Sequence, residues 1–143
     1  MKSFLLLLLL LSLLTPTLQA QFQNKTYQME SIYLRGNRYV KNGIATPIGM
    51  FGGKIESEFI DKPLATPVFK QFKRNRTIAS VLTLAGTVLV VGSFVGLSNN
   101  DFDAWVPLYL TGTVALSIGI PFNNRANNDL QQAIWLRNGE ILQ

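Results

Sequence analysis

Two uncharged apolar runs stand out in the pattern of hydrophobic and polar positions along the chain. They cover residues 77–98 and 104–122, and only the short polar stretch 99–103 separates them. A helix needs about 20 apolar residues to cross the hydrocarbon of a bilayer, so each run is long enough to span. Because so short a connection leaves the second helix beside the first, the pattern predicts a two-helix transmembrane hairpin in a mainly α membrane protein.

Amphipathic segments flank the two apolar runs. Phe69 and Phe72 lie about one turn apart before the first run, with cations around them. After the second run, one helical stripe contains Ala126, Leu130, Ala133, Ile134 and Arg137. Gly139 is a typical helix stop. We expect the hairpin to continue outside the membrane as a helical pair that buries Phe69 and Phe72 against Leu130 and Ile134.

The segment before the helices has the alternation typical of β-structure. From residue 26 onward, aromatic and branched side chains alternate with polar ones, and the pairs Gly36-Asn37 and Asn42-Gly43 suit tight turns. This pattern predicts strands over residues 26–34, 38–40 and 44–48. A two-stranded ribbon alone is only marginally stable in water, so we expect it to pack on the helices. The chain then divides into a small exported β-rich segment, residues 21–62, and the helical hairpin, residues 63–143.

A third apolar run, over residues 4–14, opens the chain. It follows Lys2 and is followed by the small residue Ala20. A basic start, a short apolar core and a small residue at the cut are typical of a secretory signal peptide, so we expect residues 1–20 to be removed. The alternative, an uncleaved anchor, would need a longer apolar run.

The composition restricts the chemistry that the chain can perform. It contains no cysteine and no histidine. The usual structural zinc sites and the Ser/His or Cys/His nucleophile pairs therefore cannot form. Glu56, Glu58 and Asp61 make a small acidic cluster, which is interpreted as a solvated helix start rather than as an acid/base or cation site. We predict no catalytic residue, no cofactor and no metal.

The net charge of +5 is concentrated where the apolar runs meet the flanking segments. The cations at these positions are Lys70, Lys73, Arg74, Arg76 and Arg125. Long cationic side chains at such positions lie along apolar surface and reach water or lipid phosphates with their charged ends. We therefore predict a lipid interface here, and no nucleic-acid partner.

Small residues in the apolar runs suggest how the two helices pack. A predicted helix-packing seam consists of Ala85, Gly92, Gly96, Gly112, Ala115 and Gly119. Small residues allow two backbones to approach closely in lipid, although glycine is also common in spanning helices for other reasons. A second stripe, Ser80, Thr83 and Thr87, would hydrogen-bond its own helix or face a neighbouring copy. Neither run holds an ionisable residue, so an ion or proton pathway of the usual kind is not expected.

Two rules disagree about orientation. Cleavage of a signal peptide places the segment before residue 77 on the exported side, whereas the cations at the outer ends of both runs predict the opposite. We follow the signal peptide and predict an inner-membrane protein of the cell envelope whose N-terminal segment is exported.

From Lys54 to Asn138 the chain resembles a recurring type of small exported two-helix membrane protein of Bacteroidota-like bacteria. The resemblance rests on Phe69-Lys70 and Lys73-Arg74 before the first run, Trp105 at the start of the second, Ile120-Pro121-Phe122 at its end and the stretch 130–134. It implies an envelope location and no reaction.

Three classes of function remain at this stage. The first is a non-catalytic envelope membrane protein, a structural or accessory subunit that contacts the lipid bilayer and an envelope protein partner or a second copy. The second is a self-assembling, bilayer-perturbing or pore-type hairpin that uses the Ser80, Thr83 and Thr87 stripe. The third is an enzyme that uses the acidic cluster. The first needs only what the sequence contains, and we predict it.

Overall fold

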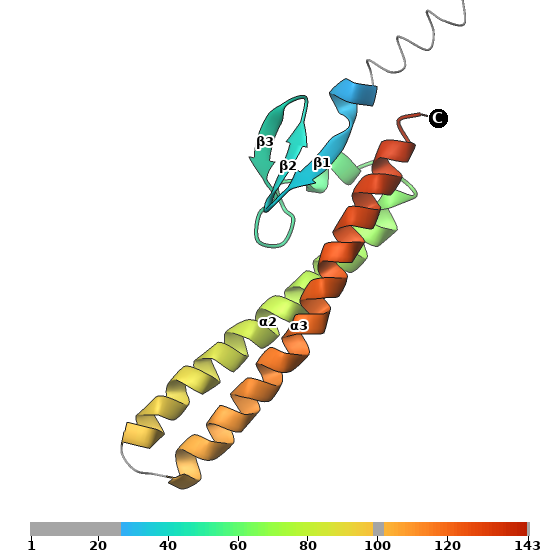
Figure 1. Cartoon of the computed structure of the whole chain (residues 1–143). Helices are drawn as coiled ribbons and strands as arrows, with labels where there is room; N and C mark the ends of the chain where they lie inside the picture. Colours follow the sequence, from blue (N-terminus) through green and yellow to red (C-terminus); the bar gives the residue numbers. More distant parts are fainter. Residues whose placement is uncertain (1–26, 99–101, 143) are drawn as a thin grey trace, which may run out of the picture.

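The computed structural model describes residues 27–98 and 102–142. The predicted signal peptide and residues 99–101 of the connection between the apolar runs lie outside these ranges. Within them the order of elements is β1 (Ile32–Arg35), β2 (Arg38–Lys41), β3 (Ile44–Pro47), η1 (Glu56–Phe59), α2 (Ala65–Ser98) and α3 (Phe102–Gly139). The chain is mostly helical, with one small antiparallel sheet beside the open end of the helical pair (Figure 1).

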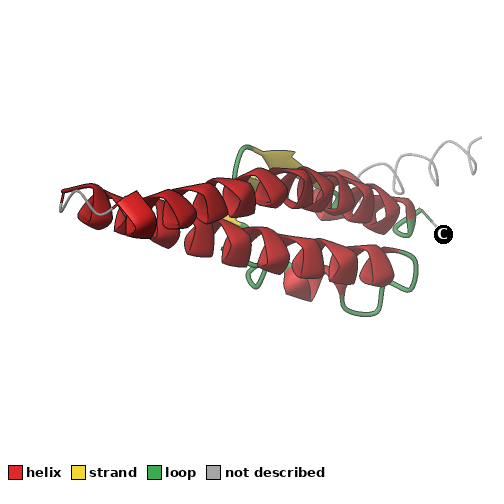
Figure 2. Ribbon diagram, turned by 90° about the horizontal axis from the view of Figure 1, so that it is seen from below, coloured by secondary structure: helices red, strands yellow, loops and turns green. Residues whose placement is uncertain are grey.

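The two long helices confirm the predicted hairpin and its amphipathic extensions. α2 has 34 residues and α3 has 38, and α3 ends at Gly139 as predicted. Both are long and apolar enough to cross a membrane. At 1.5 Å per residue, α2 is about 51 Å long and α3 about 57 Å, and both lengths exceed the roughly 30 Å of a hydrocarbon core. Figure 2 shows them side by side along their length.

The sheet has the order β1-β2-β3, with antiparallel pairing throughout. Its second turn, Asn42-Gly43, has φ values of 49° and 76°, the left-handed pair that a type I′ hairpin turn requires. The three predicted strands are confirmed, but the first is shorter than predicted. Residues 27–30 form a helical turn, and β1 begins only at Ile32, whose partner is Lys41. The chain turns after Lys41, so residues 27–31 have no strand beside them.

A hydrophobic core joins the sheet to the open end of the hairpin. Its buried residues are Ile32, Tyr39, Ile48, Ile55, Phe59, Ala65, Phe69, Phe72, Ala126, Leu130, Ala133 and Ile134. The rings of Phe59 and Phe69 stack with their centroids 4.2 Å apart. The predicted burial of Phe69 and Phe72 with Leu130 and Ile134 is confirmed. We call this unit, formed by residues 32–76 and 123–139, the headpiece, and residues 77–98 and 102–122 the apolar half.

In the apolar half the helices meet through small residues that recur every seven positions. The buried positions of α2 are Ala65, Phe69, Phe72, Ala79, Gly86 and Ser93. On α3, Gly112 and Gly119 are buried at the same spacing. A Cβ atom added to Gly86 would lie 2.8 Å from the carbonyl oxygen of Gly112, and one added to Gly112 would lie 2.8 Å from that of Gly86. The backbones therefore touch at this level.

The α2 side of the predicted seam needs a correction. Ala85 is exposed, and a Cβ at Gly92 would meet nothing within 4 Å. These two residues precede Gly86 and Ser93 by one position, which turns them about 100° away from α3. A contact that repeats every seven residues selects one stripe of each helix, and here it is the Ala79, Gly86 and Ser93 stripe.

The other four predicted positions lie closer to the contact. Gly96 faces Trp105, and its added Cβ would be 2.9 Å from the Trp105 Cβ. At Gly119 an added Cβ would be 3.3 Å from Thr83 Oγ1. Gly112 is the buried partner of Gly86, and Ala115 is half-buried.

Candidate functional site

A buried ion pair fixes the last turn of α3 to the rest of the headpiece. Arg137 is 3% exposed. Its Nη2 donates to Glu58 Oε2 at 2.7 Å, its Nε donates to the Glu58 carbonyl at 3.3 Å, and its Nη1 donates to the Glu30 carbonyl. Lys41 Nζ also donates to both oxygens of the Glu58 carboxylate, at 3.0 and 2.8 Å. The charge of Arg137 is thus compensated, as a buried cation requires.

The next residue, Asn138, holds the free edge of the sheet. Its Oδ1 accepts a hydrogen bond from Ile32 N at 3.0 Å, and its Nδ2 donates to Ile32 O at 2.7 Å. The side-chain amide therefore pairs with β1 in the way that a neighbouring strand would. This contact joins residues that are 106 positions apart in the chain.

Glu140 caps the beginning of α2. Its Oε1 accepts from Leu64 N at 2.6 Å and from Ala65 N at 3.3 Å. The first amides of a helix have no partner within the helix, and a carboxylate there satisfies them and suits the helix dipole. Together, Arg137, Asn138 and Glu140 connect α3 to η1, β1 and α2.

The acidic cluster divides between different roles. Glu56 pairs with Lys73 at 2.8 Å, and Glu58 binds the two cations described above. Asp61 is exposed, with φ of 61°. Within residues 27–98 and 102–142 there is no group of three side chains that could hold a metal ion. The interpretation as a solvated helix start is wrong for Glu58, whose side chain is only 13% exposed and pairs with the buried Arg137.

The predicted interface cations lie around the boundary between the headpiece and the apolar half. Lys70 and Arg74 are exposed. The Arg125 guanidinium lies 5.9 Å from the centroid of the Phe122 ring. Arg76 joins α3 to the loop after β3, because its Nη1 donates to Asn123 Oδ1 and its Nε donates to the Met50 carbonyl at 3.4 Å. Whether these cations contact lipid stays a prediction.

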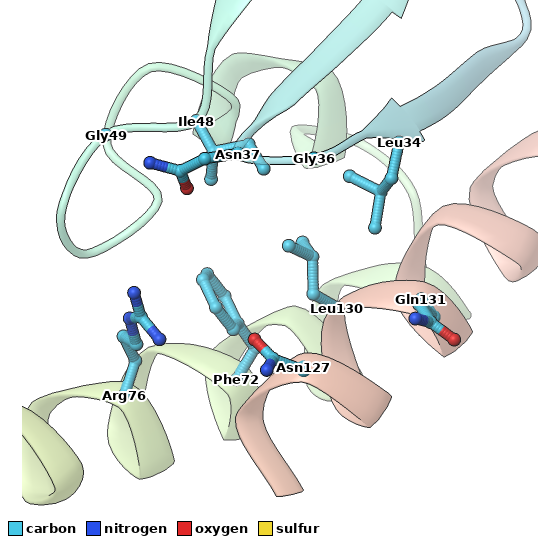
Figure 3. Close-up of a pocket in the computed structure, with 10 residues that line it drawn as sticks. All are labelled: Leu34, Gly36, Asn37, Ile48, Gly49, Phe72, Arg76, Asn127, Leu130 and Gln131. Carbon is cyan, nitrogen blue, oxygen red and sulfur yellow. The ribbon is translucent and has the colours of Figure 1, made fainter. Parts of the chain in front are cut away.

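A cavity of about 370 Å³ opens between the sheet and the two helices at this boundary (Figure 3). Its apolar wall is formed by Leu34, Ile48, Phe72 and Leu130. Its polar groups come from Asn37, Arg76, Asn127 and Gln131, and backbone at Gly36 and Gly49 completes it. Phe72 and Leu130 point from the helices toward the sheet. The cavity therefore offers amide groups and one cation above an apolar floor.

Sequence reasoning found some of these residues and missed others. Arg76 was predicted as a lipid-interface cation, and Arg137 was placed on the apolar stripe of its helix. An arginine on such a stripe is itself an indication of a buried carboxylate partner. Asn138 and the amide groups of the cavity carry no such indication, because they are ordinary surface residues until the sheet is placed.

Comparisons with family models, curated proteins and solved structures gave no match to this chain.

Proposed function

We propose that this chain is a non-catalytic membrane protein of the cell envelope, a structural or accessory subunit whose hairpin anchors the headpiece at the membrane surface. The predicted signal peptide and the resemblance described above support an envelope location, and cleavage of the signal peptide would leave the headpiece on the exported side. The protein would act by presenting the headpiece to an envelope protein or to a second copy.

The exposed apolar surface of the hairpin is the observation that carries the proposal. In the most apolar 18-residue stretch of each helix, only 17% of α2 and 11% of α3 is buried within the structure. The large side chains left exposed there are Val81, Leu84, Val88, Val91, Phe94, Val95, Leu108, Leu110, Val114, Ile118 and Ile120. An exposed apolar surface of this extent requires a cover. A lipid bilayer supplies it on all sides.

The headpiece supports a role in presentation. Its sheet is fixed to the hairpin by the stacked Phe59 and Phe69 rings, the Arg137 ion pair and the Asn138 amide. A partner that binds the sheet therefore also binds the membrane anchor. The headpiece exposes Trp135, which is 74% accessible, and Tyr33 on its outer surface. Exposed aromatic side chains are enriched at protein interfaces.

The self-assembling hairpin has less support. Thr87 Oγ1 donates to the Thr83 carbonyl at 2.7 Å, and Thr113 and Ser117 likewise bond carbonyls four residues earlier. Hydroxyl groups satisfied within their own helix do not need a neighbouring copy in lipid.

Carbonate extraction of membranes from cells that express the full chain tests the anchor. The protein should stay in the membrane pellet and need detergent for release. Double substitution of Leu84 and Val88 by arginine should move it to the soluble or aggregated fraction, because each charge at the centre of a span costs about 2.5 to 3.5 kcal/mol. The same double substitution at Asn128 and Gln132, which are exposed on α3 in the headpiece, should have no such effect.

Recovery of the unmodified chain in the soluble fraction, without detergent, would contradict the proposal. The accessory role is tested separately by a photo-cross-linking residue at Trp135 in living cells. A discrete adduct with an envelope protein or with a second copy is expected. A chain that stays monomeric, with no protein adduct at this position, would refute that part.

A further inference from the structure

Two hollows of the structure meet at Arg76. The first is the polar cavity between the sheet and the helices. The second is a mainly apolar groove of about 630 Å³ on the outer face of α2, whose lining includes Met50, Phe51, Arg76, Ser80, Thr87 and Asn123. Arg76 lines both hollows. In the loop from Ile48 to Phe51, the first two residues line the cavity and the last two line the groove.

The groove continues the cavity toward the closed end of the hairpin. On α2, Phe72 and Arg76 line the cavity, and residues from Arg76 to Thr87 line the groove. On α3, Asn127 lines the cavity, and Asn123, one turn nearer the closed end, lines the groove. At 1.5 Å per residue, the groove extends about 16 Å below Arg76 along α2. The hollow is therefore about equally polar and apolar at the level of the headpiece and mainly apolar within the apolar half.

Arg76 is a cation without a matching carboxylate among the described residues. Its Nε donates to the Met50 carbonyl at 3.4 Å and its Nη1 to Asn123 Oδ1, and Nη2 has no hydrogen-bond partner in the described part of the chain. By contrast, Lys73 and Arg137 have acidic partners. A guanidinium with free N–H groups matches the geometry of a phosphate, and an anion would balance its charge.

We propose that the cavity and the groove together bind one anionic phospholipid of the surrounding bilayer. Its phosphate lies on Arg76, its polar headgroup enters the cavity among Asn37, Asn127 and Gln131, and one acyl chain follows the groove beside Met50 and Phe51. This inference rests on the proposed membrane location. It gives the hollow one occupant, because only a lipid combines an anionic end with an apolar chain of this length.

Lipid binding to the full chain by native mass spectrometry tests the proposal. Dioleoylphosphatidylglycerol should bind at one saturable site, about tenfold more tightly than zwitterionic dioleoylphosphatidylcholine. Glycerol 1-phosphate, which has the anion but no acyl chain, should neither bind measurably nor compete. Both halves of the hollow are thereby tested with defined probes.

Matched variants locate the site. Arg76→Gln should weaken phosphatidylglycerol binding about tenfold, the loss expected for one charge-assisted phosphate contact. Arg74→Gln removes the same charge from an exposed position that lines neither hollow, so binding should not change. Ser80→Phe fills the groove and should also weaken binding, whereas Val88→Phe, which lies outside it, should not.

Three results would overturn the proposal. Equal losses in Arg76→Gln and Arg74→Gln would show a response to net charge alone. Equal affinity for the two phospholipids would remove the role of the cation. Competition by glycerol 1-phosphate would show a simple anion site. Circular dichroism of each variant verifies folding, and carbonate extraction separates the two proposals: a membrane-bound protein without this lipid preference refutes only the inference.

Discussion

In the headpiece, α2 and α3 are held together by large buried side chains such as Phe69 and Leu130, whereas in the apolar half their backbones touch at Gly86 and Gly112. Buried charge follows the same division, because the Arg137 pair lies in the headpiece. The position of large apolar side chains is also opposite in the two regions. Phe69 in the headpiece is 3% exposed, whereas Phe94 in the apolar half is 57% exposed.

The proposed membrane location accounts for this difference, because it places the two regions in different solvents. In water, burying apolar area stabilises a fold by about 25 cal/mol per Å², which favours large side chains in the core. Lipid is as apolar as leucine and provides no such driving force, so helices associate through close contacts of small residues. The same two helices therefore obey two sets of packing rules along their length.

The largest effect should come from removing an aromatic ring from the headpiece. Phe69→Ala deletes a buried ring that stacks on Phe59 and should lower the free energy of opening of the headpiece by about 3 to 5 kcal/mol. Phe94→Ala, the matched change in the apolar half, should leave it unaltered. Native-state hydrogen exchange of β1 and β2 amides in nanodiscs measures both. Equal losses would show that the apolar half packs like a water-soluble core.

A slightly smaller effect is expected from Arg137→Ala. It leaves the Glu58 carboxylate half-buried with only Lys41, and breaking a buried pair typically costs about 3 to 5 kcal/mol. We expect the low end of this range because Lys41 remains. Arg125→Ala, at an exposed position, is the control. An unchanged exchange rate in Arg137→Ala would mean that the ion pair does not fix the headpiece.

Packing in the apolar half is tested by single methyl groups. Gly86→Ala places a Cβ against the Gly112 carbonyl, which cannot rotate away, and should destabilise the hairpin by about 1 to 3 kcal/mol. Gly92→Ala meets open space and should be neutral or stabilising, because alanine favours helix. Unfolding by sodium dodecyl sulfate, followed by Trp105 fluorescence in a Trp135→Phe background, reports the difference. A larger loss of stability in Gly92→Ala than in Gly86→Ala would show that the helices meet along the predicted Ala85 and Gly92 stripe instead.

The smallest effect should be local to the edge of the sheet. Asn138→Ala removes both hydrogen bonds to Ile32 and should cost about 1 to 2 kcal/mol, expressed as faster exchange of the Ile32 amide. Asn128→Ala, at an exposed position of α3, serves as the control. Slow exchange of Ile32 in the variant would show that the amide contact is dispensable.

The spacing of hydrophobic residues, alternating in strands and repeating every 3.6 residues in helices, predicted most of the fold. The helices, the stop at Gly139, the turn at Asn42-Gly43 and the burial of Phe69 and Phe72 follow from local chemistry and amphipathicity. The extra strand length before Ile32 was predicted wrongly, because alternation says nothing about whether a partner strand is present.

The site was less predictable because it depends on register between distant segments. α2 has several stripes of small residues that could contact α3. Only the position of α3 determines that Gly86, rather than Gly92, forms the contact. The cavity likewise requires the hairpin turn at Asn37 to lie over Arg76. Contacts that join residues this far apart have no local trace in the sequence.

The Asn138 contact also sets an order of events during synthesis. Ile32 emerges from the ribosome 106 residues before Asn138, and Glu58 emerges 79 residues before Arg137. Both helices must be made before either contact can form. The nascent sheet therefore waits, with its edge unpaired, until the second helix has been completed, and a chaperone acting on this protein would meet the sheet during that interval.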